Sequence, residues 1–314
     1  MKISSVDLSK ITTYRFGGVC KSFIELVDKE DLNNLDEILL GKENVIIGKG
    51  SNVAFSDKEF QGNVICPKFA TIEEKSETEI TVGASVFLPD LSRYFKENEF
   101  SNGEFLIGIP GTVGGAVKMN AGAYDWEFSD LVQYIECFDL NTSNIIKLNK
   151  DDINFSYRSS QNLDNKIILS ATLQIEKGDI NKINSNLANF NKIRKNSQPP
   201  AIYNAGSVFK NTKDYTAGKL IDEAGLKGYE IDGVSVSEKH ANFFIAKKEA
   251  KSLSLYKLVQ HVKEVIDSKF GIRLEEEIIF IGDFDLWIFP VKLKVNLSEH
   301  SLFLFLLDYW FLVS

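Results

Sequence analysis

The sequence predicts an α+β protein of more than one domain, and three observations support this fold class. Short stretches of β-forming residues in the first half are typical of strands. Three longer stretches, 88–98, 179–195 and 253–270, are expected to be helices. The chain of 314 residues is long enough for two or three domains. We therefore expect a β-rich first region with small helices, followed by an α+β module.

The first region is expected to contain many short strands. A helix is predicted over 31–40, and residues 132–140 and 145–148 are predicted to form a hairpin around the polar turn 141–144. The helix over 88–98 is amphipathic, because Leu88 and Leu91 lie at helical spacing with Tyr94 and Phe95. The other expected strands are 21–26, 45–47, 64–66, 72–76, 79–84 and 166–175.

The main domain boundary is expected after the helix over 179–195. Its apolar stripe could pack between two domains, and Gln198-Pro199-Pro200 then ends the helix because proline lacks a backbone N–H. This places one region at 1–195 and a second at 196–284. The second region is expected to follow the order turn 204–207, strand 208–209, helix 217–224, strand 241–246, helix 253–270 and strand 275–281.

Residues 285–314 differ in character and form an apolar tail of unknown role. It contains two apolar clusters, 286–289 and 302–307. The second is interrupted by Asp308 and is shorter than the roughly 20 residues that span a bilayer. Three interpretations stay open for this tail: an appendage on the surface or poorly ordered, a partner-binding segment, or a membrane contact.

Composition and charge exclude several classes of protein. The fractions of 44% hydrophobic and 25% charged residues are those of an ordinary globular protein. A formal net charge of −8 argues against a nucleic-acid partner, although a local anion site is compatible with it. Cys20, Cys66 and Cys137 are odd in number and lie in apolar surroundings, so we expect neither a disulfide framework nor a metal site. We expect a cytoplasmic monomer with no membrane association.

Two glycine-rich stretches stand out as candidate binding sites. An apolar strand runs into the turn Gly48-Lys49-Gly50-Ser51-Asn52, and five glycines fall between Gly108 and Gly122. Glycine permits positive φ and a close approach of the backbone to a phosphate group. Either stretch alone more often forms only a tight turn. Together they suggest one long, doubly charged ligand.

With these stretches, the chain resembles the UDP-N-acetylenolpyruvoylglucosamine reductase (MurB) family, in its shorter-loop subclass. The matching motifs appear in the family's order between about residues 10 and 284, which is more specific than any single turn. They are Tyr14-Arg15-Phe16-Gly17-Gly18, the turn 48–52, residues 108–124, Tyr157-Arg158-Ser159-Ser160, Gly206-Ser207-Val208-Phe209-Lys210-Asn211, and the segments 224–228, 237–243 and 274–278.

The resemblance implies a fold, a reaction and two cofactors. Residues 1–195 would be an FAD-binding region of the vanillyl-alcohol-oxidase (PCMH) type, with two lobes that divide near 60–70, and 196–284 an α+β substrate domain. NADPH would reduce FAD, and the flavin would then pass hydride to the enolpyruvyl group of the UDP-sugar in peptidoglycan precursor synthesis. The partners are accordingly the small-molecule UDP-sugar and NADPH.

The resemblance also assigns catalytic roles to Arg158, Ser207 and Glu277. The Arg158 guanidinium suits a carboxylate or its enolate, because its donors form a fixed fork. Ser207 matches the family's proton donor, and Glu277 matches the residue that assists the enolate. Without the motif, Arg158 would ordinarily be interpreted as part of a surface ion pair and Ser207 as a turn serine. The three adjacent glutamates would be interpreted as a solvated edge. Strand alternation would separate Glu276 from Glu275 and Glu277, and the motif selects Glu277.

Cofactor and substrate contacts follow from the same motifs. Asn211 is the expected contact to the sugar. The segment between Ser207 and Glu277 carries no long tyrosine-bearing insertion, which leaves the UDP pyrophosphate contacts open. The residues expected to bind the flavin are Gly48, Gly50, Ser51, Asn52, Gly111, Thr112, Gly114, Gly115, Asn120 and Ala121.

Two alternatives to the reductase remain at this point. Another FAD-dependent oxidoreductase of the same fold, such as an oxidase, would keep the glycine turns but would not use Arg158, Ser207 and Glu277 together. A flavin- or nucleotide-binding module without catalysis is the third possibility.

Overall fold

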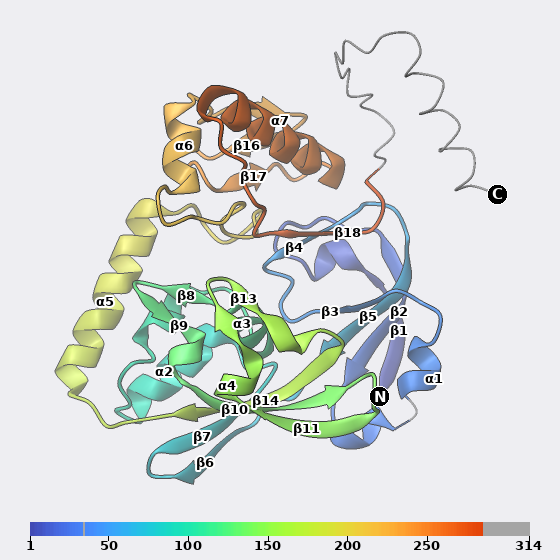
Figure 1. Ribbon diagram of the computed structural model, residues 1–314, viewed down its shortest axis with the longest axis vertical. Coiled ribbons are helices and arrows are strands. Elements are labelled where there is room, and N and C mark those ends of the chain that lie inside the picture. Colours follow the sequence, from blue (N-terminus) through green and yellow to red (C-terminus); the bar gives the residue numbers. More distant parts are fainter. Residues whose placement is uncertain (34, 285–314) are drawn as a thin grey trace, which may run out of the picture. The chain divides into compact units, whose positions relative to one another are not determined.

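The computed structural model describes residues 1–33 and 35–284, which form one compact unit (Figure 1). The predictions for the apolar tail, residues 285–314, lie outside the described residues. The compact unit combines helices with a mixed sheet and a fully antiparallel sheet, and the predicted α+β fold class is confirmed.

The first sheet is mixed and has the order β1-β2-β5-β3. Its strands are β1 (Lys2–Asp7), β2 (Val19–Leu26), β5 (Phe60–Pro67) and β3 (Asn44–Ile46). β1 and β2 are antiparallel, whereas β2 and β3 both pair with β5 in parallel. The predicted continuous helix over 31–40 is wrong: a 3-10 turn (Lys29–Leu32) follows the N-cap Asp28 and ends at the extended residue Asn33, and α1 covers only Leu35–Leu39.

The second sheet is entirely antiparallel, with the order β11-β10-β14-β7-β6. The predicted hairpin is confirmed by β10 (Val132–Asp139) and β11 (Asn144–Asn149). The remaining strands of this sheet are β6 (Ile72–Ser76), β7 (Glu79–Gly83) and β14 (Lys166–Gln174).

Helices α2 (Leu88–Glu97) and α3 (Val113–Met119) share a hydrophobic core with the second sheet. α2 confirms the predicted amphipathic helix, since Leu88, Leu91 and Phe95 are buried. Shorter elements complete this region: η1 (Leu8–Lys10), β4 (Val53–Phe55), η3 (Glu104–Gly108), β8 (Gly122–Ala123), β9 (Trp126–Glu127), η4 (Phe128–Asp130), α4 (Lys150–Ile153), β12 (Phe155–Ser156), β13 (Ser159–Ser160) and η5 (Gln161–Leu163).

The long helix α5 (Ile180–Ser197) leads from the second sheet to the last part of the described chain (Figure 1). The Asp179 side chain caps its first turn, and the helix ends at Gln198, where the stretch Gln198-Pro199-Pro200 was predicted to end it. The last part contains α6 (Ala217–Glu223), α7 (Ser252–Phe270) and a small sheet of β15 (Glu230–Ile231), β16 (Val234–Val236) and β17 (Phe244–Ala246).

Three strands predicted in the last part are shorter than expected. β17 begins at Phe244, β18 covers only Ile279–Ile281, and Ser207 and Phe209 form only isolated bridges, to Phe243 and Glu276. β18 pairs in parallel with β4, directly after the first glycine turn. The end of the described chain therefore pairs with a segment more than two hundred residues earlier. This pairing depends on the tertiary structure and cannot be predicted from local periodicity.

The amino-terminal motif around Tyr14 belongs to the hydrophobic core of the last part. Tyr14 is fully buried there, and its hydroxyl donates a hydrogen bond to the Phe244 carbonyl at 3.1 Å. The Tyr203 N–H donates to the Thr13 carbonyl at 2.9 Å. These contacts hold residues 196–284 against the start of the chain.

Candidate functional site

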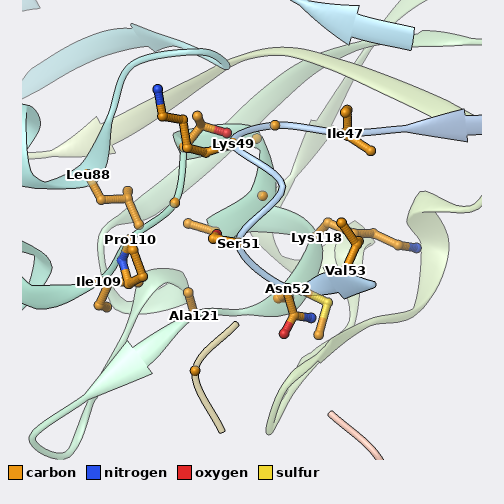
Figure 2. A pocket seen from close by; sticks show the side chains of 18 of the residues that line it. Ile47, Lys49, Ser51, Asn52, Val53, Leu88, Ile109, Pro110, Lys118 and Ala121 are labelled. Atoms are coloured by element: carbon orange, nitrogen blue, oxygen red, sulfur yellow. The ribbon is translucent and has the colours of Figure 1, made fainter. Parts of the chain in front are cut away.

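A cavity of about 610 Å³ is lined by residues from both glycine-rich stretches and from the part of the chain after α5. This volume lies in the ordinary range for ligand pockets. Figure 2 shows the turn that carries Lys49, Ser51 and Asn52 beside the segment that carries Ile109 and Pro110. The two stretches, about sixty residues apart in the sequence, therefore face one space.

The first glycine turn presents unpaired backbone donors to this cavity. The ladder of the first sheet ends with the Ile47 N–H, which donates to the Ile65 carbonyl at 2.9 Å. The N–H groups of residues 48–52 donate no hydrogen bond to any other described residue. Gly50 has φ of +63°, a conformation that reverses the chain and suits glycine. A row of free N–H groups is a favourable site for a phosphate group.

The second stretch brings α3 against the first turn. The N–H groups of Val113 and Gly114 donate to the Val86 and Ala84 carbonyls, which fixes the start of the helix. A Cβ added at Gly115 would meet only the Thr112 hydroxyl, at 3.7 Å, so this cavity-lining position has open space on its side-chain side. A ligand backbone can approach closely there.

Nine of the ten residues predicted to bind flavin line the cavity, namely Gly48, Gly50, Ser51, Asn52, Gly111, Thr112, Gly114, Gly115 and Ala121. Asn120 does not line it. This residue is fully buried in the left-handed conformation at the end of α3 (φ +41°), and its amide donates to Glu127 at 2.7 Å and to the Ser156 carbonyl at 3.0 Å. These bonds connect the end of α3 to the hairpin β8-β9 and the hairpin β12-β13, so Asn120 has a structural role.

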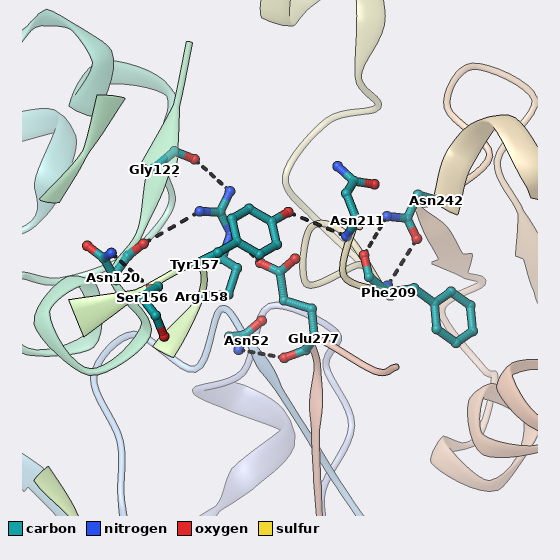
Figure 3. A network of polar contacts seen from close by, with 10 residues as sticks. All are labelled: Asn52, Asn120, Gly122, Ser156, Tyr157, Arg158, Phe209, Asn211, Asn242 and Glu277. Atoms are coloured by element: carbon teal, nitrogen blue, oxygen red, sulfur yellow. Dashed lines mark hydrogen bonds and ion pairs between the residues drawn. The ribbon is translucent and has the colours of Figure 1, made fainter. Parts of the chain in front are cut away.

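Arg158 and Glu277 form an ion pair at the cavity, with 3.0 Å between Nε and Oε1 (Figure 3). Arg158 lies in the turn between β12 and β13 with φ of +53°. Its guanidinium also donates to the Gly122 carbonyl at 2.9 Å and to the Asn120 carbonyl at 3.5 Å. Only 18% of the Arg158 side chain and 16% of the Glu277 side chain are exposed, so both groups are held in a fixed position.

Burial raises the pKa of the Glu277 carboxyl above its ordinary value, and the nearby Arg158 guanidinium partly opposes this shift. The neighbouring glutamates point to other partners: Glu275 pairs with Lys210, and Glu276 with Lys263. Of the three adjacent carboxylates, the one that lines the cavity is therefore Glu277.

Ser207 lines the same cavity as Arg158 and Glu277. It follows Gly206, which has φ of +78°, and it bridges to Phe243 in antiparallel fashion. Among the residues that the structure describes, its hydroxyl has no hydrogen-bond partner within the protein. The hydroxyl is therefore free to bond to a ligand.

Asn211 does not line the cavity. Its side-chain oxygen accepts a hydrogen bond from the Ala217 N–H at 3.0 Å, at the start of α6, and its own N–H donates to the Tyr157 hydroxyl at 3.4 Å (Figure 3). The Tyr157 ring lies 4.8 Å from the Arg158 guanidinium carbon. Asn211 is thus connected to the Arg158 turn through Tyr157.

Sequence reasoning missed several residues that line the cavity, among them Lys49, Lys166, Arg194 and Gln198. Arg194 and Gln198 lie at the end of α5. Arg194 falls on the same helical face as Leu187 and Phe190, but a charged residue there carries no apolar signal, so periodicity did not single it out. The described residues contain no group of three or more His, Cys, Asp or Glu side chains that could hold a metal ion. No helix within residues 1–33 or 35–284 is long and apolar enough to cross a bilayer.

Comparison with known proteins agrees with this geometry. A model of the UDP-N-acetylenolpyruvoylglucosamine reductase C-terminal domain matches residues 198–281, and a model of an FAD binding domain matches residues 40–149. The reductase of that name from Caldicellulosiruptor saccharolyticus is 38% identical over 299 residues, which cover 91% of this chain and 94% of the relative. The corresponding protein of Rickettsia peacockii is 37% identical over 281 residues, 88% of this chain and 94% of the relative.

The fold is similar to that of a reductase of this name whose structure has been solved. The crystal structure of the reductase from Thermus caldophilus matches with a TM-score of 0.79 and 29% identity, covering 90% of this chain and all of that one. The resemblance and the FAD-binding fold expected from the sequence motifs are both confirmed by these comparisons.

Proposed function

This chain belongs to the UDP-N-acetylenolpyruvoylglucosamine reductase family, and we propose that it reduces the enolpyruvyl group of UDP-N-acetylenolpyruvoylglucosamine with NADPH, yielding UDP-N-acetylmuramate for peptidoglycan synthesis. The observation that carries the proposal is the meeting of Arg158, Ser207 and Glu277 at the cavity that both glycine stretches line. In this proposal residues 1–195 bind the flavin and residues 196–284 bind the substrate. The reaction is proposed to take place in the cytoplasm.

FAD is the cofactor that the cavity suits. The free N–H groups of residues 48–52 would hold its pyrophosphate, and Gly111 and Gly115 leave room for close contact. When bound, FAD would supply the hydride-transfer chemistry between NADPH and the enolpyruvyl methylene. The protein's own side chains then have two tasks: stabilising the negative charge that develops beside the carboxylate, and delivering a proton.

Arg158 and Glu277 serve the first task in this proposal. The N–H groups of Arg158 that remain free of Glu277, Gly122 and Asn120 are available to the substrate carboxylate and its enolate. Because its pKa is raised by burial, the Glu277 carboxyl holds a proton more readily than an exposed glutamate and can donate a hydrogen bond to the enolate.

Ser207 serves the second task. Its hydroxyl lines the cavity and makes no bond within the described protein, so it can donate a proton to the carbon next to the carboxylate. A hydroxyl is a weak acid, but the enolate carbon is basic enough to accept its proton when the two are held together. Asn211 is proposed to bind the sugar after the loop that carries it turns from its present partner, the Ala217 N–H.

We expect Ser207→Ala to separate the two half-reactions. Reduction of the flavin by NADPH should change by less than about twofold, whereas its reoxidation by the UDP-sugar should slow by about 10²- to 10⁴-fold, the usual contribution of a positioned acid. Stopped-flow absorbance of the flavin measures both steps. Ser197→Ala, on the exposed end of α5, is the matched control and should change neither.

Equal slowing of both half-reactions in Ser207→Ala would contradict the role of Ser207. A yellow protein that consumes no NADPH in response to the UDP-sugar would contradict the proposed substrate and favour another FAD-dependent oxidoreductase of this fold.

A further inference from the structure

The lysine and arginine side chains that line the cavity differ in whether a carboxylate of the protein pairs with them. Three of them are neutralised by carboxylates: Lys118 by Asp164 at 2.8 Å, Lys166 by Asp139 at 3.4 Å and Arg158 by Glu277 at 3.0 Å. Lys49 and Arg194 also line it, and neither has an ion-pair partner in the described chain. Lys49 belongs to the first glycine turn, where the flavin pyrophosphate is proposed to bind.

Arg194 is partly buried although it lacks such a partner, and this burial lowers the pKa of its guanidinium below the ordinary value. It lies in the last turn of α5, and within residues 1–33 and 35–284 its guanidinium makes no hydrogen bond. A Cβ added at Gly108 would lie 2.7 Å from Arg194 Cδ and 3.0 Å from Nη1, so the side chain lies directly against the Gly108 backbone. An arginine keeps its charge at neutral pH, and burying that charge unpaired is costly. The position suits a residue that pairs with an anionic ligand.

Gln198 supplies a second, independent observation. It lies one turn after Arg194, and its N–H donates to the Arg194 carbonyl at 2.9 Å. Its side-chain oxygen is buried, lines the same cavity with the rest of Gln198, and has no hydrogen-bond partner within the described residues. Buried acceptors are almost always bonded, so a donor from outside the protein is expected at this end of the cavity.

We propose that Arg194 binds the diphosphate of the nucleotide ligand that is not the flavin, and that Gln198 accepts a hydrogen bond from an N–H or O–H of the same ligand. This inference rests on the proposed function, in which both the UDP-sugar and NADPH carry a diphosphate. A diphosphate needs a cation where it binds, in a chain whose net charge is −8. Of the cavity's cations, Arg194 is the one outside the glycine turns that no carboxylate neutralises.

The test measures binding of UDP and of uridine to the flavin-loaded protein, by titration of the flavin spectrum. For Arg194→Gln we expect the Kd of UDP to rise about ten- to a hundredfold, the loss of a charge-assisted pair, and the Kd of uridine to change less than about twofold. Arg194→Lys should recover part of the UDP affinity. Lys192→Gln removes the same charge from an exposed position on α5 and is the matched control.

A second variant, Gly108→Ala, keeps the charge but displaces the guanidinium, and it should also weaken UDP relative to uridine. Unchanged UDP binding and unchanged NADPH affinity in Arg194→Gln would overturn the proposal. So would an equal loss for UDP and uridine, or a loss confined to flavin content, because the guanidinium would then serve packing or the flavin.

The two nucleotide ligands are distinguished by separate measurements. Weaker UDP binding assigns Arg194 to the UDP-sugar, and a higher NADPH concentration for half-maximal flavin reduction assigns it to NADPH. Both effects together indicate that the two ligands use this residue in turn. Neither UDP binding nor flavin reduction by NADPH needs turnover of the UDP-sugar. Failure of the wild-type chain to reduce the UDP-sugar would therefore contradict the proposed function, whereas the UDP titrations and the NADPH dependence of flavin reduction decide the role of Arg194.

Discussion

Three adjacent glutamates show how much the surroundings of one side chain decide. Glu275 is 72% exposed beside Lys210, Glu276 pairs with Lys263 of α7, and Glu277 is held by Arg158 inside the cavity. The Asn52 amide also donates to the Glu277 carbonyl at 3.0 Å, which ties this residue to the first glycine turn. The three glutamates thus differ in position although they are chemically identical: Glu275 lies at the surface, Glu276 pairs with α7 and Glu277 lies at the cavity.

The raised pKa of Glu277 predicts a pH-dependent effect of Glu277→Gln on stability. The folded protein holds this proton more tightly than the unfolded chain does, so the wild-type fold loses stability as pH rises above the ordinary glutamate pKa of about 4.3 and through the higher folded pKa. Glutamine carries no such charge. The stability of Glu277→Gln relative to wild type should therefore increase as pH rises through the range between the unfolded and the folded pKa, and then level off.

Urea unfolding of the flavin-free protein between pH 4 and pH 8 measures this difference. A difference that stays constant would show that the Arg158 charge cancels the effect of burial on the pKa of Glu277, and a difference that falls as pH rises would show that it outweighs burial.

The glycine-rich segments owe their function to two different physical requirements. Gly50 has φ of +63°, and a Cβ there would lie 2.8 Å from the Ile11 carbonyl oxygen, so the fold itself requires glycine. Gly115 has ordinary helical backbone and open space in front of it, so only a bound ligand requires glycine there. The two positions look alike in the sequence.

Gly50→Ala and Gly115→Val should therefore behave differently. Gly50→Ala should lower the free energy of unfolding of the flavin-free protein by about 1–3 kcal/mol, through left-handed strain and the contact with Ile11. Gly115→Val should leave that value within about 1 kcal/mol but abolish flavin retention, because its branches fill ligand space.

Flavin absorbance after gel filtration and urea unfolding report the two quantities. Full flavin content in Gly115→Val would remove this position from the cofactor site.

Four hydrophobic clusters within residues 1–284 account for the cohesion of the described unit. One joins the two large sheets through Ile24, Leu26 and Ile65 of the first and Ile167 and Leu169 of the second. Another joins the amino-terminal motif to α6 and α7. The last strand, β18, pairs with β4, and the buried Phe284 stacks on Tyr256 of α7.

A chain that ends after Phe284 should consequently retain flavin, and its free energy of unfolding should lie within about 1 kcal/mol of that of the full chain. A chain that ends after Phe270 is the contrasting variant. It lacks β18 and Glu277 and should lose both flavin and cooperative unfolding. Loss of flavin from the first variant would assign residues 285–314 a part in the fold.

The sequence by itself determined the α+β class, the long helices and the order of the motifs, because these depend on apolar periodicity, caps and glycine or proline at particular positions. Tertiary structure decided that Arg158 pairs with Glu277 across 119 positions and that Asn120 supports hairpins instead of lining the cavity. It also left Arg194 without a carboxylate. Ion pairing and cavity lining depend on which distant backbones meet, and local patterns carry no information about such contacts between residues far apart in the chain.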